Sequence, residues 1–404
     1  MRRSLPWALF LAVSWTWCIG MYLPTLMVRD GGLPFFFAFL IPNVLGAASV
    51  GWVLRDPERS RRFVATRRTM MLAFTAVTIA FHAYFLVWQS GSALLSSRPE
   101  RLGGVVLGIS LIGNAIAVRR RVDWLPALVT LLISVCFAGV LVAFAPTNAG
   151  ASDAVAIAGL AAVTSLGFLL CPYLDLTFNR AAQHAKSPRA AFTIGFLVIF
   201  TATILLATGG RALWTPRDGL YFITLGWYDF AVGCHFGAQA MFTVAAHIAA
   251  LRLLRADGAI AHESGPDQRP PRPAVWATAP ILVGLLAGLA LFFLPGDANE
   301  RSISLAGFTS PIAGHEVGYR LFLGAYGLVF PVWLLMTSRG HADTARSTLA
   351  WTAVACVAGT PFLWVGAVGR DEVWLLPGVA LLLVLAAVRY ALAGSRSVRF
   401  PGPD

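Results

Sequence analysis

Charge is scarce in this sequence. Only 12% of its 404 residues are charged, whereas a soluble globular domain carries roughly 25%. A soluble enzyme, a disordered protein and a coiled coil all need a charged surface in water, so the shortage excludes these three classes. Apolar residues make up 57% of the chain, and its mean hydropathy is +0.71. The composition therefore predicts an all-α polytopic membrane protein with no separate soluble domain.

Cysteine and lysine are also rare. The five cysteines are dispersed within apolar stretches and form no CxxC pair, so we expect buried thiols, with neither a disulfide framework nor a metal site. Lys186 is the only lysine among 31 basic residues. The arginines stand at the ends of apolar runs and are not interleaved with aromatic residues, so the net charge of +12 does not indicate a nucleic-acid partner.

Apolar runs bounded by arginine, proline and glycine predict about twelve membrane-spanning helices. The first run begins like a signal peptide, but Trp15 and Trp17 stand where a signal peptidase needs small residues, so we expect a retained span. The spans lie near residues 5–28, 33–54, 70–90, 102–118, 124–145, 153–178, 190–208, 220–253, 275–294, 318–337, 348–368 and 373–393. The stretch from Leu213 to Tyr228 is expected to lie along the membrane interface.

The distribution of arginine predicts the orientation. With the N-terminus in the cytoplasm, 23 of the 31 basic residues fall on the cytoplasmic side, as the positive-inside rule requires. We therefore expect a multi-pass protein of the cytoplasmic (inner) membrane with both termini inside. Residues 254–274 are rich in proline and polar residues and predict a flexible cytoplasmic loop, and residues 394–404 form a cytoplasmic tail.

Two spans carry residues that interrupt a helix. The first contains Gly20 and Pro24, and the sixth contains Gly167 followed by Cys171 and Pro172. Proline removes a backbone donor and clashes with the carbonyl four residues earlier. Such a break inside a membrane is tolerated only where the freed backbone groups meet protein, water or a ligand. By the predicted orientation, these two spans cross the membrane in opposite directions.

Interrupted helices five spans apart are typical of an inverted repeat of five plus five spans. With two further spans at the end, the chain resembles the amino acid–polyamine–organocation and sodium:solute symporter superfamily. The resemblance implies repeats at about 5–145 and 153–337, extra helices at 348–393 within one transmembrane domain (1–393), and alternating-access transport of a small, amino-acid-like organic solute. The major facilitator fold is the competing twelve-span architecture, but its long cytoplasmic connection usually follows the sixth span, whereas here it follows the eighth.

Polar residues recur within four spans, and ionisable groups inside a membrane usually face a cavity or a partner. The eighth span has His235, Gln239, Thr243 and His247 at intervals of four. Spans 1, 3, 6 and 8 surround the site in the resembled fold, which implies a polar cavity here. The substrate-binding candidates are Trp17, Cys18, Gly20, Tyr22, His82, Cys171, Tyr173 and Gln239. For each histidine taken alone, interhelical hydrogen bonding is an equally good explanation.

The coupling ion is less well specified. Sodium-coupled members of the superfamily use hydroxyl groups of the eighth span, but here that span offers a single mid-helix Thr243, so Na⁺ is less favoured than H⁺. Imidazole titrates near physiological pH, and Asp175 could share a proton with His82 or His235. We therefore expect proton coupling through these three residues, or facilitation without coupling, and no other cofactor.

Two alternatives remain open at this point. A receptor or accessory membrane subunit could keep the transporter fold without transport. An integral membrane enzyme would need a metal or acid–base cluster, or paired histidines for a haem, and the seven histidines form no HxxxH or HxxHH motif. We therefore expect no enzymatic activity, while the solute and the oligomeric state stay open.

Overall fold

The structure is a computed structural model of the 404-residue chain. It describes residues 4–95, 98–119, 122–140, 144–146, 153–209, 214–216, 221–256, 273–293, 303–305, 308–310, 314–337 and 345–396. Most of the predicted loop at 254–274 and of the predicted tail at 394–404 lies outside these described residues.

Helices account for almost all of the described chain. The first half contains α1 (Leu5–Trp15), α2 (Cys18–Val53), α3 (Pro57–Leu95), α4 (Pro99–Arg119), α5 (Trp124–Val140), α6 (Ala154–Leu170), the 3₁₀ helix η2 (Cys171–Leu174) and α7 (Leu176–His184). One continuous run follows, made of α8 (Pro188–Thr193), the π-helix η3 (Ile194–Phe200), α9 (Thr201–Thr203) and the π-helix η4 (Ile204–Gly209).

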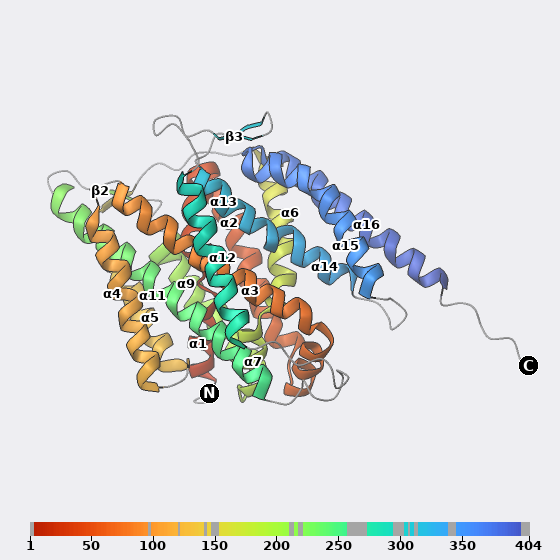
Figure 1. The fold of residues 1–404 in the computed structure, drawn as a ribbon, viewed down its shortest axis with the longest axis horizontal. Helices are drawn as coiled ribbons and strands as arrows, with labels where there is room; N and C mark the ends of the chain where they lie inside the picture. Colours follow the sequence, from red (N-terminus) through yellow and green to blue (C-terminus); the bar gives the residue numbers. More distant parts are fainter. Residues whose placement is uncertain are drawn as a thin grey trace, which may run out of the picture.

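The second half is also helical. It contains α11 (Tyr221–Ala256), α12 (Pro273–Phe293), α13 (Gly314–Gly324), η5 (Ala325–Val329), α14 (Phe330–Met336), α15 (Ala345–Leu363), η6 (Trp364–Val368), η7 (Glu372–Trp374) and α16 (Leu375–Arg396). Two short antiparallel ladders pair β1 (Phe144–Pro146) with β2 (Trp214–Pro216) and β3 (Ile303–Leu305) with β4 (Phe308–Ser310). Both ladders lie at the end of the molecule opposite the start of α1 (Figure 1).

The helices have the length and composition of membrane spans. Nine helical stretches of the described chain are long and apolar enough to cross a membrane, and three shorter apolar helices accompany them: Leu5–Trp15, Trp124–Ala138 and Val275–Leu291. All of the predicted spans overlap these helices. The expectation of an all-α, multi-pass membrane protein is confirmed, while the total of twelve crossings stays a prediction.

The long helix α2 joins the end of the first predicted span to the second. Gly31 and Gly32 leave helical geometry between the two parts, and Gly32 has a φ of 69°. This left-handed conformation favours glycine because it crowds a Cβ atom. Pro34 then stands near the start of the next helical segment, where a missing N–H costs little. The predicted boundary between these spans, at residues 29–32, coincides with this kink.

The start of α11 differs from the prediction. We expected Leu213 to Tyr228 to lie along the interface, but residues 221–228 form the first turns of α11, and Trp214–Pro216 forms strand β2. Residues 221–228 contain no proline and only one glycine, Gly226. Nothing in the local sequence therefore ends the helix before it reaches the polar residues of the eighth span.

The two helices at the N-terminus are buried within the bundle. α2 packs along α6, and α1 packs along η3. A Cβ atom on Gly46 would overlap the carbonyl of Phe168, so the backbones of α2 and α6 touch there. By contrast, α15 and α16 lie at one edge of the molecule (Figure 1) and expose many leucine and valine side chains. The fold therefore buries the helices that carry the predicted site.

Candidate functional site

The first predicted span is interrupted. α1 ends at Trp15 and α2 begins at Cys18, and Trp17 between them has extended backbone with φ −67° and ψ 178°. The indole Nε1 of Trp17 donates to the carbonyl of Ser14 at 2.5 Å, which satisfies an acceptor at the end of α1. The break lies one turn before the predicted position, since Gly20 is helical within α2.

Side chains from two other helices hold the start of α2. The N–H of Cys18 donates to Nε2 of His82 at 3.3 Å, and the Cys18 carbonyl accepts from the Tyr319 hydroxyl at 2.9 Å. Nδ1 of His82 lies 2.7 Å from the Thr78 carbonyl. A carbonyl oxygen can only accept, so Nδ1 is the donor and His82 is a neutral imidazole with both nitrogens engaged by backbone groups. His82 therefore caps α2.

The sixth predicted span is also interrupted. α6 ends at Leu170, η2 continues as one 3₁₀ turn that contains Pro172, and α7 begins after Asp175. Asp175 is the N-cap of α7: its Oδ1 accepts from the N–H of Thr177 at 2.6 Å, as capping carboxylates do. An interruption is therefore present, but it lies later than predicted: Gly167 is still helical within α6, and the break runs from Cys171 to Asp175.

The two interruptions lie against each other. Oγ1 of Thr177 donates to Oγ of Ser14 at 3.4 Å. The rings of Trp15 and Phe178 have centroids 4.9 Å apart. The chain rises from α1 to α2 and descends from α6 to α7 (Figure 1). The broken regions thus come from segments that run in opposite directions and meet in the interior.

A buried acid and a buried histidine face each other at this junction. Oδ2 of Asp175 lies 3.9 Å from Nε2 of His247, and both side chains are 0% exposed. Among the described residues, neither Oδ2 of Asp175 nor either ring nitrogen of His247 has a hydrogen-bond partner. We expected Asp175 to share a proton with His82 or His235. The histidine beside its carboxylate is instead His247, one turn beyond Thr243 on α11.

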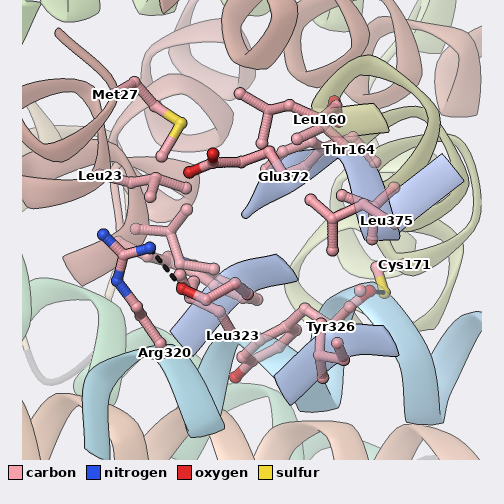
Figure 2. Close-up of a pocket in the computed structure, with 18 of the residues that line it drawn as sticks. Leu23, Met27, Leu160, Thr164, Cys171, Arg320, Leu323, Tyr326, Glu372 and Leu375 are labelled. Atoms are coloured by element: carbon pink, nitrogen blue, oxygen red, sulfur yellow. Dashed lines mark hydrogen bonds between the residues drawn. The ribbon is translucent and has the colours of Figure 1, made fainter. Parts of the chain in front are cut away.

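An apolar cavity of about 100 Å³ lies beside the interruptions. Trp15, Trp17 and Tyr326 supply aromatic surface, and Arg320 and Glu372 supply charged groups. Figure 2 shows Met27, Leu160, Thr164 and Glu372 along one side and Leu323, Tyr326 and Cys171 along the other. The Arg320 guanidinium donates to the carbonyl of Ala367 at 2.5 Å.

A charged cluster lies at the Arg320 end of the cavity. We call it the Asp30 cluster, and its members are Arg29, Asp30, Glu316, Arg320 and Arg370. Arg29 and Arg320 both pair with Glu316, at 2.6 Å and 2.8 Å. Asp30 pairs with Arg320 and, at 3.0 Å, with Arg370. The Asp30 and Arg320 side chains are only 1% and 5% exposed. The cluster therefore ties α2 to α13 and to the turn before α16.

The predicted substrate-binding residues divide among several places. Trp17 and Cys171 line the cavity, and the Cys171 thiol donates to the Tyr326 carbonyl at 3.2 Å. Tyr22 lines a second pocket of about 280 Å³ with Trp88, Gln89, Arg101 and Tyr228.

The remaining candidates lie outside both pockets. Gly20 faces Ile204, to which a Cβ atom would lie 3.1 Å away. The Tyr173 hydroxyl lies 3.0 Å from Oγ of Ser49. Gln239 donates to Oγ of Ser134 at 3.1 Å. Cys18 and His82 are joined to each other at the start of α2. These side chains support the helices around the cavity.

The last predicted spans contribute to the cavity, which was not expected from the sequence. Arg320 and Tyr326 come from the tenth predicted span, and Glu372 immediately precedes the twelfth. Arg320 carried a usable signal, because an arginine within an apolar span is a site candidate in its own right. Tyr326 carried none, since an aromatic residue in a membrane helix is unremarkable. We expected spans 3 and 8 at the cavity, but neither span contributes a residue to its lining, and span 8 instead supplies His247 beside Asp175.

The described residues contain no group of three or more His, Cys, Asp or Glu side chains placed to hold a metal ion. No protein-family model matches the chain, and no curated protein matches its sequence significantly. The site must therefore be interpreted from its own geometry.

Proposed function

We propose that the protein is a secondary transporter that moves a small organic solute across the cytoplasmic membrane by alternating access, with protons as the coupling ion. One observation carries the proposal: two interrupted helices of opposite direction meet at a buried, incompletely hydrogen-bonded Asp175 and His247. Membrane transporters built from inverted repeats use such broken helices to form their central site. The proposal extends the resemblance to the amino acid–polyamine–organocation and sodium:solute symporter superfamily.

The cavity supports a small and largely apolar solute. An engineered apolar cavity of about 150 Å³ admits benzene, so the cavity of about 100 Å³ limits the enclosed part of the solute to a smaller group. Trp15, Trp17 and Tyr326 offer aromatic surface against which that body can pack. Of the two charged side chains, Arg320 is already paired with Glu316. Glu372 is the remaining charged group that can orient a polar part of the solute.

The Asp30 cluster supports a gate at one end of the cavity. In the predicted orientation this end faces the outside. Arg29 on α2 pairs with Glu316 on α13, and Arg370 before α16 pairs with Asp30. These pairs join α2, α13 and the turn before α16 at one end of the cavity. Separating these segments therefore requires that the pairs break. Alternating access needs such a bistable closure, because packed interfaces switch between discrete arrangements.

The junction supports coupling to protons. Asp175 and His247 approach within 3.9 Å without further hydrogen-bond partners among the described residues. An acid and an imidazole this close titrate as a coupled pair, so one proton can reside on either group. Asp175 is also the N-cap of α7 and lies next to the contact of Thr177 with Ser14. A change in its charge therefore acts on the contact between the two interrupted helices.

The experiment is solute uptake by purified protein in sealed vesicles. A screen for ligands that raise the melting temperature first identifies a solute, and its uptake is then measured with imposed pH or sodium gradients. We expect a pH gradient to drive accumulation and a sodium gradient to have no effect. Binding without any uptake would favour a receptor, and drive by sodium alone would refute proton coupling.

A further inference from the structure

One face of α11 presents a polar side chain at every turn to the protein interior. His235, Gln239, Thr243 and His247 follow at intervals of four residues, and each is 0% exposed. We call this face the α11 stripe. At about 1.5 Å per residue, its ends lie roughly 18 Å apart, so it extends through more than half of a membrane's apolar core.

Between Gln239 and His247, the stripe has polar atoms that are not hydrogen-bonded within the described chain. Oε1 of Gln239, Oγ1 of Thr243 and both ring nitrogens of His247 have no partner among the described residues. The same holds for Oδ2 of Asp175, next to His247, and for Oγ1 of Thr75 on α3, which packs against α7 and α11. Buried polar groups without partners are costly, and in folded proteins such groups are usually satisfied by ordered water.

The spacing of the stripe suits water bridges. Residues four apart rise by about 6 Å along a helix, and two hydrogen bonds of roughly 2.8 Å through one water cover nearly that distance. Single water molecules can therefore link Gln239 to Thr243 and Thr243 to His247. Each link ends on an atom that lacks a protein partner.

The other end of the stripe already forms a hydrogen-bonded chain with α5. Nδ1 of His235 lies 2.9 Å from Oγ of Ser134, and Nε2 of Gln239 donates to the same oxygen at 3.1 Å. The ring of Phe137 stacks on His235 with centroids 5.2 Å apart and lies 6.0 Å from the ring of Tyr228. Tyr228 lines the second pocket, so Phe137 separates His235 from that pocket.

We propose that the α11 stripe holds a row of buried water molecules that carries protons between His235 and the Asp175–His247 pair. The inference rests on the proposed proton coupling and gives it a route. A proton arrives on one water or side chain as another leaves to the next, so the row ends each passage with its protons restored. Phe137 covers the His235 end, and Asp175 and His247 receive the proton at the other end.

Other titratable or charged side chains stand on the elements around the pair. They include Cys18 on α2, Arg67, Arg68 and His82 on α3, Cys171 and Tyr173 on η2, Arg180 and His184 on α7, Asp229, His235 and Arg252 on α11, and Tyr326 on η5. His82 already bonds two backbone groups. No ion pair with an arginine is formed by Asp175 within the described chain.

A fluorescence measurement tests the route without a solute. The ring of Trp17 lies 5.8 Å from that of His247, and a protonated imidazole quenches a neighbouring indole. In sealed vesicles, a rapid drop in external pH from about 8 to about 5, which brackets the titration of histidine, should quench the emission of Trp17. The signal is assigned by its absence in Trp17→Phe and in His247→Gln.

Variants of the α11 stripe distinguish a proton route from a row of polar residues with a purely structural role. Thr243→Val and Gln239→Leu should slow the quenching by at least about tenfold, which corresponds to ~1.4 kcal/mol in the barrier. Thr243→Ser keeps the hydroxyl and should restore the original rate. Thr352→Val is the matched control, because Thr352 is also buried but bonds the Thr348 carbonyl of its own helix. It should leave the rate unchanged.

The results distinguish the proton route from the proposed function. Unchanged rates in both Thr243→Val and Gln239→Leu would overturn the route, and so would a wild-type protein without quenching that depends on His247. Solute uptake that ignores a pH gradient would instead contradict the proposed function, since the quenching needs no solute. Slow quenching in the two variants with rescue by serine supports the route.

Discussion

The carboxylate of Asp175 lies 3.9 Å from Nε2 of His247, and neither side chain is exposed to solvent. Asp175 caps the helix that follows the sixth-span interruption, while His247 belongs to the uninterrupted α11. Movement of the broken helix relative to α11 therefore changes this distance directly. The pair therefore joins a titratable group of the broken helix to one of the unbroken α11.

Replacement of Asp175 by asparagine should uncouple transport from the pH gradient. The amide still accepts a hydrogen bond from the N–H of Thr177, so α7 keeps its cap, but it cannot take up a proton. We expect solute uptake to lose its response to an imposed pH gradient in vesicles. Asp153→Asn is the matched control, because Asp153 caps α6 in the same way at 3.2 Å. An equal loss in both variants would assign the effect to capping alone.

The thiol of Cys171 should report occupation of the cavity. Cys171 lines the cavity and is 2% exposed, so its alkylation by a small membrane-permeant maleimide requires that the reagent enter. A solute that raises the melting temperature should slow this alkylation by about tenfold or more when it is present well above its dissociation constant. Cys356, which lies on α15 outside the cavity lining, is the internal control. Equal protection of the two thiols, measured by mass spectrometry, would contradict the site.

Removal of the Glu316 charge should destabilise the protein. Glu316 is 8% exposed and accepts from both Arg29 and Arg320. Removing one partner from a buried ion pair costs about 3–5 kcal/mol, so Glu316→Gln should lower the melting temperature by several degrees. Glu58→Gln removes an exposed carboxylate that pairs with Arg62 and should cost roughly 0–1 kcal/mol. Similar melting temperatures for the two variants would argue against a closed gate.

Replacement of His82 by alanine should weaken the fold rather than the proton response. The change removes the acceptor of the Cys18 N–H, and a buried donor without a partner costs about 1–3 kcal/mol. His184→Ala is the control, because Nδ1 of His184 also bonds the carbonyl four residues earlier but lies at an exposed site. We expect a lower melting temperature for His82→Ala only, with the pH drive of uptake retained. Loss of the pH drive in His82→Ala would instead show that His82 takes part in proton coupling, as the sequence predicted.

The sequence predicted the class of protein and both helix interruptions. Apolar length and scarce charge are enough to define membrane helices, and Pro172 marks a break by removing a backbone donor. The first break was placed one turn too late, because Gly20 and Pro24 are tolerated in α2. The chain actually leaves the helix before Trp17, whose indole N–H donates a hydrogen bond to the carbonyl of Ser14 at the end of α1. No regular sequence signal marks a helix end that is satisfied by a tryptophan side chain.

The pairing within the site was harder to predict. The α11 stripe was visible in the sequence, yet the choice of His247 over His235 as the neighbour of Asp175 depends on the height at which α7 crosses α11. The same applies to Tyr326 and Arg320, which reach the cavity because η5 packs beside α6 and α13 packs beside η6. Relative heights and rotations of helices come from tertiary packing, and periodicity within one helix does not contain them.

Cross-linking of the two interrupted helices tests the central claim most directly. Oγ of Ser14 and Oγ1 of Thr177 are 3.4 Å apart, so the double variant Ser14→Cys and Thr177→Cys, in a background without the native cysteines, should form a disulfide under mild oxidation in the membrane. Each single variant is the control. Efficient cross-linking in the double variant is the predicted result, and two free thiols after oxidation would show that the interruptions do not meet.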